Sequence, residues 1–418
     1  MELEGHLHKA LPPISAPTAL AEVGARGWHA LGGDLAFPVF LLKDGALRHN
    51  QETMSAFCAA HRVRLAPHGK TTMSAQLIRR QLAAGAWAIT AANAVQARAM
   101  RAFGAERVII ANQVVDPVGI HWIGEETAAH PNAWIASLVD SIRGVELFDE
   151  GLAAVGPPRQ APVLVEVGAM GARTGCRTLE EGLAVADAVA RSRHLQLVGV
   201  EGYEGALGGG SADDTTLQRI DAFCTSVRQL LEALAARGDF DRLDEILVTA
   251  GGSSYFDRVV AVLGEGWDVG RPVALAIRSG CYLTHDHGNY RVTGPLGHRS
   301  GGPELQPAME IWGLVNSRPE PGLALLGFGK RDVSYDAALP NPLRVRSRDG
   351  VERPAGGMTV TKLNDQHAYL QVPPDDPLQV GDLVGCGLSH PCTAFDKWRV
   401  VPIVDDDYRV LEVAETAF

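Results

Sequence analysis

The chain has 418 residues, 46% of them hydrophobic and 21% charged, with a formal net charge of -11. This composition is typical of a globular protein, and the length predicts either one large domain with an appendage or two domains. The negative charge and the lack of a lysine- and arginine-rich block disfavour nucleic acid as a partner, and the apolar runs are too short to cross a membrane.

The cysteines and the first residues indicate a cellular location. Six cysteines are scattered without a close pair, and residues 1–9 contain acidic residues but no apolar stretch typical of a secretory signal. We therefore expect a reducing, cytoplasmic environment.

Residues 1–32 contain prolines, glycines and a short helical pattern, and we expect them to pack on the C-terminal domain. From 33 to 298, apolar runs alternate with helical patterns, as in a parallel sheet covered by helices. Eight such units close a TIM-like (β/α)8 barrel, so one of nine candidate strands lies outside the ring, and the sequence leaves open which. An open dinucleotide-binding sheet is disfavoured because no G-x-G-x-x-G turn follows the first run. The nine candidates are 37–42, 63–66, 87–90, 108–111, 134–139, 162–167, 195–200, 246–249 and 273–277.

The pattern changes after residue 290. Short strand-like runs then follow a glycine-rich stretch, with no long helix between them. We predict a separate, mostly β domain over residues 299–418.

The motif PHGKTT at 67–72 follows the second apolar run. Barrel strands present their carboxyl ends to the active face, so Lys70 is placed to enter a pocket, where a desolvated amine attacks carbonyl carbon. The alternative is an ordinary surface lysine.

Two glycine-rich turns follow the last two barrel runs: TAGGSS at 249–254 and RSGCY at 278–282. Backbone amides and hydroxyls in such turns can bind a phosphate, although the first could equally be a flexible turn. Arg173 and Tyr203 also follow strand ends, where they could contact a ligand, or else form an ion pair and pack.

The motif SHPCT at 389–393 contains a candidate metal pair. In an extended segment His390 and Cys392 would point to the same side, and imidazole plus thiolate suits zinc. The alternative is a buried cysteine beside an unrelated histidine. A second metal-like spacing, His285-Asp286-His287, is interpreted as a solvated turn.

Together these motifs resemble the fold-type III (alanine racemase-like) pyridoxal-phosphate enzymes, most closely the D-serine dehydratase and D-threonine aldolase family. The resemblance implies that Lys70 binds pyridoxal 5'-phosphate covalently and that His390 and Cys392 hold Zn2+ or another divalent metal such as Mn2+. It also implies a homodimer and a cofactor site formed by Lys70, His68, Arg173, Tyr203, Gly252, Ser253, Ser254, Gly280, Cys281 and Tyr282.

The resemblance implies dehydration of a D-3-hydroxy amino acid, with D-serine giving pyruvate and ammonia. The same groups could instead cleave D-threonine or 3-hydroxy-D-aspartate to glycine and an aldehyde. The histidine and cysteine pair favours the dehydratase, because the resemblance associates histidine plus aspartate with the aldolases. A racemase or a non-catalytic cofactor carrier fits less well, because the first needs no metal and the second has no added β domain.

Overall fold

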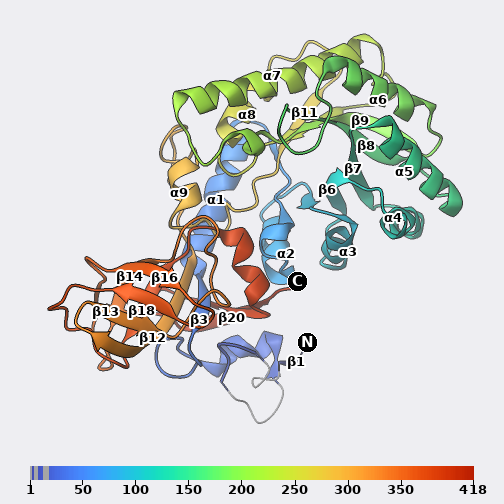
Figure 1. Ribbon diagram of the computed structural model, residues 1–418. Helices are drawn as coiled ribbons and strands as arrows, with labels where there is room; N and C mark the ends of the chain where they lie inside the picture. The colour runs from blue at the N-terminus through green and yellow to red at the C-terminus, as the bar shows by residue number, and fades with distance from the viewer. Residues whose placement is uncertain (1, 4–7, 13–17) are drawn as a thin grey trace.

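The computed structural model describes residues 2–3, 8–12 and 18–418, and its two large sheets lie in separate parts of the molecule (Figure 1). The first sheet has eight strands, all parallel, and seven helices lie between them in sequence. The strands are β4 (Arg64–Leu65), β5 (Ile89–Ala91), β6 (Arg107–Gln113), β7 (Trp134–Val139), β8 (Ala161–Val167), β9 (Leu195–Gly202), β10 (Ile246–Ala250) and β11 (Val273–Ile277).

Backbone hydrogen bonds close this sheet into a barrel. Its order is β4-β11-β10-β9-β8-β7-β6-β5, and the two ends meet where Trp87 N–H donates to Leu65 O (2.8 Å) and Thr90 N–H to Pro67 O (2.9 Å). The interior is filled by a separate cluster of buried side chains that includes members of every strand or its immediate neighbour, such as Ile109, Leu164 and Leu247. A filled interior of this kind is typical of (β/α)8 barrels, so the predicted fold class is confirmed.

Helices cover the outside of the barrel (Figure 1). Several begin at a capping side chain just after a strand; for example, Asn93 accepts a hydrogen bond from the Gln96 amide, and Asp116 from the Gly119 amide. These caps fix where their strand-to-helix loops end. The helices are α2 (Ala75–Ala83), α3 (Ala94–Ala102), α4 (Pro117–Ala129), α5 (Ile142–Val155), α6 (Leu179–Arg191), α7 (Asp214–Ala236) and α8 (Phe256–Leu263).

The candidate strand outside the ring is the first one. Strand β3 (Val39–Lys43) pairs antiparallel with β12 (Met309–Glu320) and parallel with β19 (Val400–Val404), so it belongs to the second sheet although it precedes the barrel in sequence. Helix α1 (Asp44–Ala60) then leads the chain from this sheet to β4 (Figure 1).

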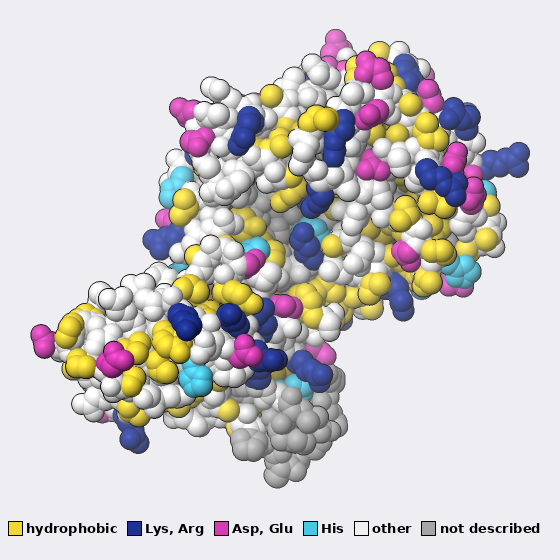
Figure 2. All heavy atoms as spheres, viewed as in Figure 1, with side chains coloured by type: hydrophobic (Ala, Val, Ile, Leu, Met, Phe, Trp, Pro, Cys, Tyr) yellow, Lys and Arg dark blue, Asp and Glu magenta, His cyan; other side chains and the backbone are white. Residues whose placement is uncertain are grey.

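The second sheet is mostly antiparallel and has ten strands among the described residues. Its centre is β12 between β18 and β13, with Trp312 fully buried. On the face shown in Figure 2, Lys and Arg side chains are interspersed with Asp and Glu over both domains. The remaining strands are β13 (Leu323–Leu326), β14 (Asn341–Arg346), β15 (Glu352–Pro354), β16 (Thr359–Leu363), β17 (Ala368–Gln371), β18 (Leu383–Gly387) and β20 (Val410–Glu415).

Residues 1–32 are described in part, since 1, 4–7 and 13–17 lie outside the described residues. The described part forms a short ladder between β1 (Glu2–Leu3) and β2 (Thr18–Ala19), followed by a 3-10 helix at Leu20–Arg26. It contacts the C-terminal domain through Lys9, whose amine lies 2.8 Å from an Asp332 carboxylate oxygen, and through Ala30 N–H, which donates to Tyr408 O (2.8 Å). Within the described part of the chain, no helix has the length and apolar character needed to span a membrane.

Candidate active site

A cavity of about 520 Å3 lies at the carboxyl ends of the barrel strands, and residues of the second domain complete its wall. The barrel contributes loops after β4, β5, β8, β9, β10 and β11 and the end of β6, as expected for this fold. All the predicted site residues except Ser254 and Tyr282 line it. The cavity is lined by His68, Lys70, Thr71, Ala92, Ala111, Asn112, Arg173, Thr174, Tyr203, Gly252, Ser253, Arg278, Gly280, Cys281, Tyr290, His390 and Cys392.

Lys70 enters the cavity from a 3-10 turn (Gly69–Thr71) directly after β4. The residue is half-buried, and its amine makes no hydrogen bond or ion pair with the residues that the structure describes. The surface-lysine alternative therefore does not hold. An amine without a partner inside a cavity is free to react with a ligand carbonyl.

His68 lies beside this lysine and is held by the neighbouring loop. Burial first, and then the charges of Lys70 and Arg278, lower the pKa of His68 well below its ordinary value, so the imidazole is neutral. Its Nδ1 is buried and has no hydrogen-bond partner among the described residues. A Cβ at Gly280 would lie 2.5 Å from the His68 carbonyl oxygen, so only glycine allows these two loops to approach so closely.

Arg173 and Tyr203 face each other at the ends of β8 and β9. The Arg173 guanidinium lies 4.9 Å from the centre of the Tyr203 ring, and no carboxylate of the described residues is within ion-pair distance of it. Burial raises the pKa of Tyr203 to about 12, so the phenol stays protonated. Arg173 is therefore a cation available to an anionic ligand.

The glycine turn after β10 differs from its prediction. The amides of Gly251 and Gly252 donate to the buried carboxylate of Glu204, at 3.0 and 2.6 Å, although the turn was expected to offer its amides to a phosphate. Burial raises the pKa of Glu204, and these two hydrogen bonds oppose that shift. Two amide donors of the predicted phosphate turn are thus already used by the protein itself.

The two predicted residues outside the cavity have other contacts. The Ser254 hydroxyl is 2.8 Å from that of Thr293, and the Tyr282 side chain is buried against a separate small hollow near Leu296. Ser253 does line the cavity, and its hydroxyl accepts the Cys281 amide (3.2 Å). Adjacent residues of a turn thus face different ways: Ser253 lines the cavity, whereas Ser254 does not.

Only His390 has the extended backbone that the spacing suggested, because Cys392 lies on a 3-10 turn (Pro391–Thr393) that begins at the next residue. The ring Nδ1 of His390 is 2.6 Å from a carboxylate oxygen of Asp336, which also accepts the Thr393 hydroxyl on its other oxygen (2.7 Å). The Cys392 contact, followed by Asp336, raises the pKa of His390 to about 9, whereas hydrogen bonds from Cys281 and His390 lower the pKa of the Cys392 thiol. No group of three or more His, Cys, Asp or Glu side chains in the described ranges is arranged to hold a metal ion.

The second metal-like spacing is not the solvated turn that was expected. His285 and Asp286 are buried, with 4% and 0% of their surface exposed, and the Asp286 carboxylate accepts the amides of Gly288 (2.9 Å) and Tyr290 (3.0 Å). This carboxylate therefore fixes the start of α9 (Asn289–Thr293), which carries Tyr290 into the cavity.

Comparison with known proteins finds similar chains. Residues 308–404 match the family described as "Putative serine dehydratase domain". A 3-hydroxy-D-aspartate aldolase of Paracoccus denitrificans (strain Pd 1222) is 25% identical over 373 residues, 88% of each chain. The resemblance to the D-serine dehydratase and D-threonine aldolase family is confirmed.

Solved structures of similar proteins share the fold. The D-threonine aldolase of Filomicrobium marinum superposes with a TM-score of 0.75 at 24% identity, covering 92% of this chain and 95% of that one. The D-threo-3-hydroxyaspartate dehydratase of Delftia sp. HT23 gives 0.71 at 18% identity, with 92% and 98% covered.

Sequence reasoning missed several cavity residues, and Arg278 is the charged one among them. It forms an ion pair with Glu201 and donates to the Thr249 hydroxyl (3.0 Å). Burial raises the pKa of Glu201, and the positive charge of Arg278 opposes this shift. A single arginine directly after an apolar strand was the available signal. Thr71, Asn112, Thr174 and Tyr290 were missed as well.

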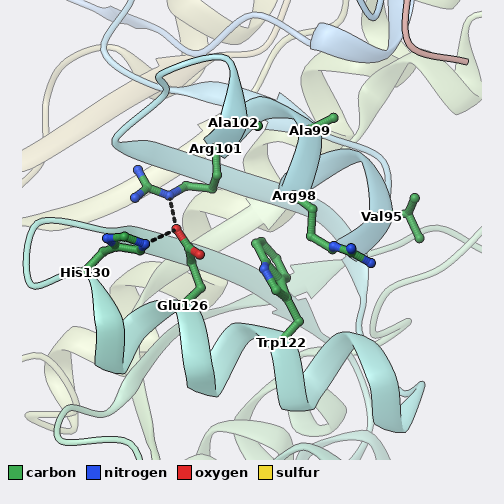
Figure 3. Close-up of a pocket in the computed structure, with 8 residues that line it drawn as sticks. All are labelled: Val95, Arg98, Ala99, Arg101, Ala102, Trp122, Glu126 and His130. Atoms are coloured by element: carbon green, nitrogen blue, oxygen red, sulfur yellow. Dashed lines mark hydrogen bonds and ion pairs between the residues drawn. The ribbon is translucent and has the colours of Figure 1, made fainter.

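A second hollow, of about 630 Å3, lies between α3 and α4 on the outside of the barrel (Figure 3). Arg101 pairs there with Glu126 at 2.8 Å, and His130 contacts the same carboxylate at 3.7 Å. Its charged groups are thus partly neutralised, and it holds no lysine or cysteine. The cavity around Lys70 is the candidate active site.

Proposed function

We propose that the chain is a pyridoxal-phosphate-dependent lyase acting on a small D-3-hydroxy amino acid. The observation that carries the proposal is the convergence on one cavity of a free amine, Lys70 of the barrel, and an imidazole and thiol pair, His390 and Cys392 of the second domain. Relatives named as an aldolase and a dehydratase of such amino acids support it.

The residues present fit pyridoxal phosphate. Lys70 has an unpaired amine for the cofactor aldehyde, and the unpartnered Nδ1 of His68 and the buried Arg278 guanidinium offer polar contacts for the ring. Since Glu204 already binds the Gly251 and Gly252 amides, the phosphate would be held by Ser253 and the loop at Gly280 instead.

The residues also fit a divalent metal. The contact of Asp336 with Nδ1 of His390 leaves Nε2 as the ligand atom, an arrangement typical of metal-binding histidines. The lowered pKa of the Cys392 thiol favours the thiolate that a metal needs. Two protein ligands leave positions open for substrate.

Each of the chain's residues then has a defined task. Bound pyridoxal phosphate supplies an electron sink for negative charge at Cα. The Lys70 amine would take the α-proton, and Arg173 would bind the substrate carboxylate. His390 and Cys392 would hold a metal whose chemistry is Lewis-acid stabilisation of a departing hydroxyl.

Within this class we propose D-serine as substrate. Loss of the α-proton and the β-hydroxyl as water would leave an enamine, which hydrolyses to pyruvate and ammonia. The presence of cysteine beside His390 supports dehydration, as the family resemblance associates this pair with dehydratases. The second candidate is retro-aldol cleavage of D-threonine or 3-hydroxy-D-aspartate, which the names of two relatives favour.

A product assay separates the candidates. D-Serine and D-threonine are each incubated with the enzyme, with and without a chelator and added Zn2+, and 2-oxo acid, ammonia, glycine and aldehyde are measured together. Oxo acid and ammonia that disappear with chelator are expected; glycine with aldehyde would establish the aldolase. Racemisation that resists chelation, or no turnover of any D-amino acid, would contradict both. The homodimer stays a prediction for light scattering to test.

A further inference from the structure

Two cysteine thiols from different domains meet in the cavity. Cys281 follows β11 of the barrel, Cys392 lies on the turn after β18, and their Sγ atoms are 3.4 Å apart. Each sulfur also lies near the Thr71 hydroxyl, at 3.7 and 3.6 Å. Both cysteines line the cavity, so a small solute that enters it can reach them.

The other four cysteines have no such neighbour. Cys58, Cys176, Cys224 and Cys386 are buried, and no second sulfur is within hydrogen-bonding distance of any of them among the described residues. Among the six cysteines, only Cys281 and Cys392 therefore have their sulfurs close together.

We propose that Cys281 and Cys392 are a reversible oxidation site, at which a peroxide converts the two thiols into a disulfide between the domains. The sulfurs need to approach from 3.4 Å to the bond length of about 2.05 Å, which is a small side-chain movement. The peroxide oxidises one sulfur to a sulfenic acid and leaves as water or an alcohol. The second thiol then attacks this sulfur, and the hydroxyl leaves with the thiol proton as a second molecule of water. Two thiols lose two hydrogens, and the peroxide is reduced by two electrons.

The disulfide would have two consequences at the site. It would tie the loop after β11 to the turn that directly follows His390, and it would remove the Cys392 sulfur from the pair proposed to bind metal. The second consequence rests on the proposed function, whereas formation of the bond rests on the thiol geometry alone.

The experiment uses the reduced full-length protein after removal of metal by a chelator. Hydrogen peroxide is added, and free thiols are counted after denaturation. We expect a decrease from six to four, a mass loss of two hydrogens, and a cross-linked peptide pair containing residues 281 and 392. A thiol reductant should restore six thiols. Prior loading with Zn2+ should slow the reaction.

Cysteine variants show which residues form the cross-link. Cys281→Ser and Cys392→Ser should each abolish the cross-link, whereas Cys58→Ser, which changes a cysteine without a sulfur neighbour, should keep it. Six remaining thiols, or added oxygen on Cys392 to the same extent in wild type and in Cys281→Ser, would overturn the proposal. A disulfide that forms in a protein without lyase activity would refute the proposed function and leave this inference standing. Metal-dependent lyase activity without any cross-link would support the proposed function and refute this inference.

Discussion

Replacing Glu201 with alanine removes the acidic partner of a buried arginine. The side chains of Arg278 and Glu201 are 5% and 1% exposed, and Arg278 lines the cavity. In Glu201→Ala the guanidinium keeps the Thr249 hydroxyl at 3.0 Å and the Gly202 carbonyl at 3.2 Å but loses its ion pair. Because a desolvated charge without its partner is costly, we expect the free energy of unfolding to fall by about 3–5 kcal/mol.

Urea unfolding followed by both fluorescence and circular dichroism would measure this change, provided that the two transitions coincide. Glu201→Gln keeps an oxygen acceptor at the same position and should lose less than Glu201→Ala. The double variant Glu201→Ala, Arg278→Met also removes the stranded charge and should recover most of the stability. A loss below about 1 kcal/mol in Glu201→Ala, or a double variant no more stable than the single one, would refute the assignment of a buried ion pair.

Three further outcomes are expected. Lys70→Ala should lower the lyase rate by about 10²–10⁴-fold. Mass spectrometry after borohydride reduction should find no covalently bound pyridoxal phosphate in this variant, and retained attachment would contradict the role of Lys70. Asp336→Asn should weaken metal binding about 10–100-fold in a competition titration, because His390 loses its orienting carboxylate. The control Asp365→Asn, which changes an exposed acid, should leave metal binding unchanged. Burial raises the pKa of Asp286 to about 6, against about 3.9 in the unfolded chain, so the native state holds its proton more tightly. The stability of the wild type relative to Asp286→Asn should therefore fall by about 2 kcal/mol as pH rises from 4 to 6 in denaturation curves, and a constant difference would contradict this.

The barrel was predictable because its strands are continuous apolar runs between capped helices. The place of β3 was not, since four of its five residues are buried and apolar, as in a barrel strand. Its sheet is decided by its partners β12 and β19, which come far later in the chain. Local composition contains no information about that pairing.

The residues of the site also divide into those that the sequence predicts and those that it does not. Lys70, Arg173 and Tyr203 were found because they directly follow strands, and parallel strands bring their carboxyl ends together. Asp336 was not found, because it lies in a loop 54 residues before the histidine that it contacts. The use of the Gly251 and Gly252 amides by Glu204 was equally hidden, since glycines followed by serines look the same whether an internal carboxylate or a bound phosphate accepts their hydrogen bonds.

The junction between the domains sets the distance between the two halves of the site. After β11 the chain runs alongside the end of β18, where His287 N–H donates to Leu388 O (2.8 Å) and Asn289 N–H to Ser389 O (3.2 Å). A Cβ at Gly288 would lie 2.6 Å from the Ser389 Cβ, so this close pairing requires glycine. His390 is the next residue in the chain, and it is therefore fixed by backbone hydrogen bonds to the segment that follows the barrel. Neither domain alone forms the cavity, and the arrangement of Lys70 relative to His390 follows from this pairing.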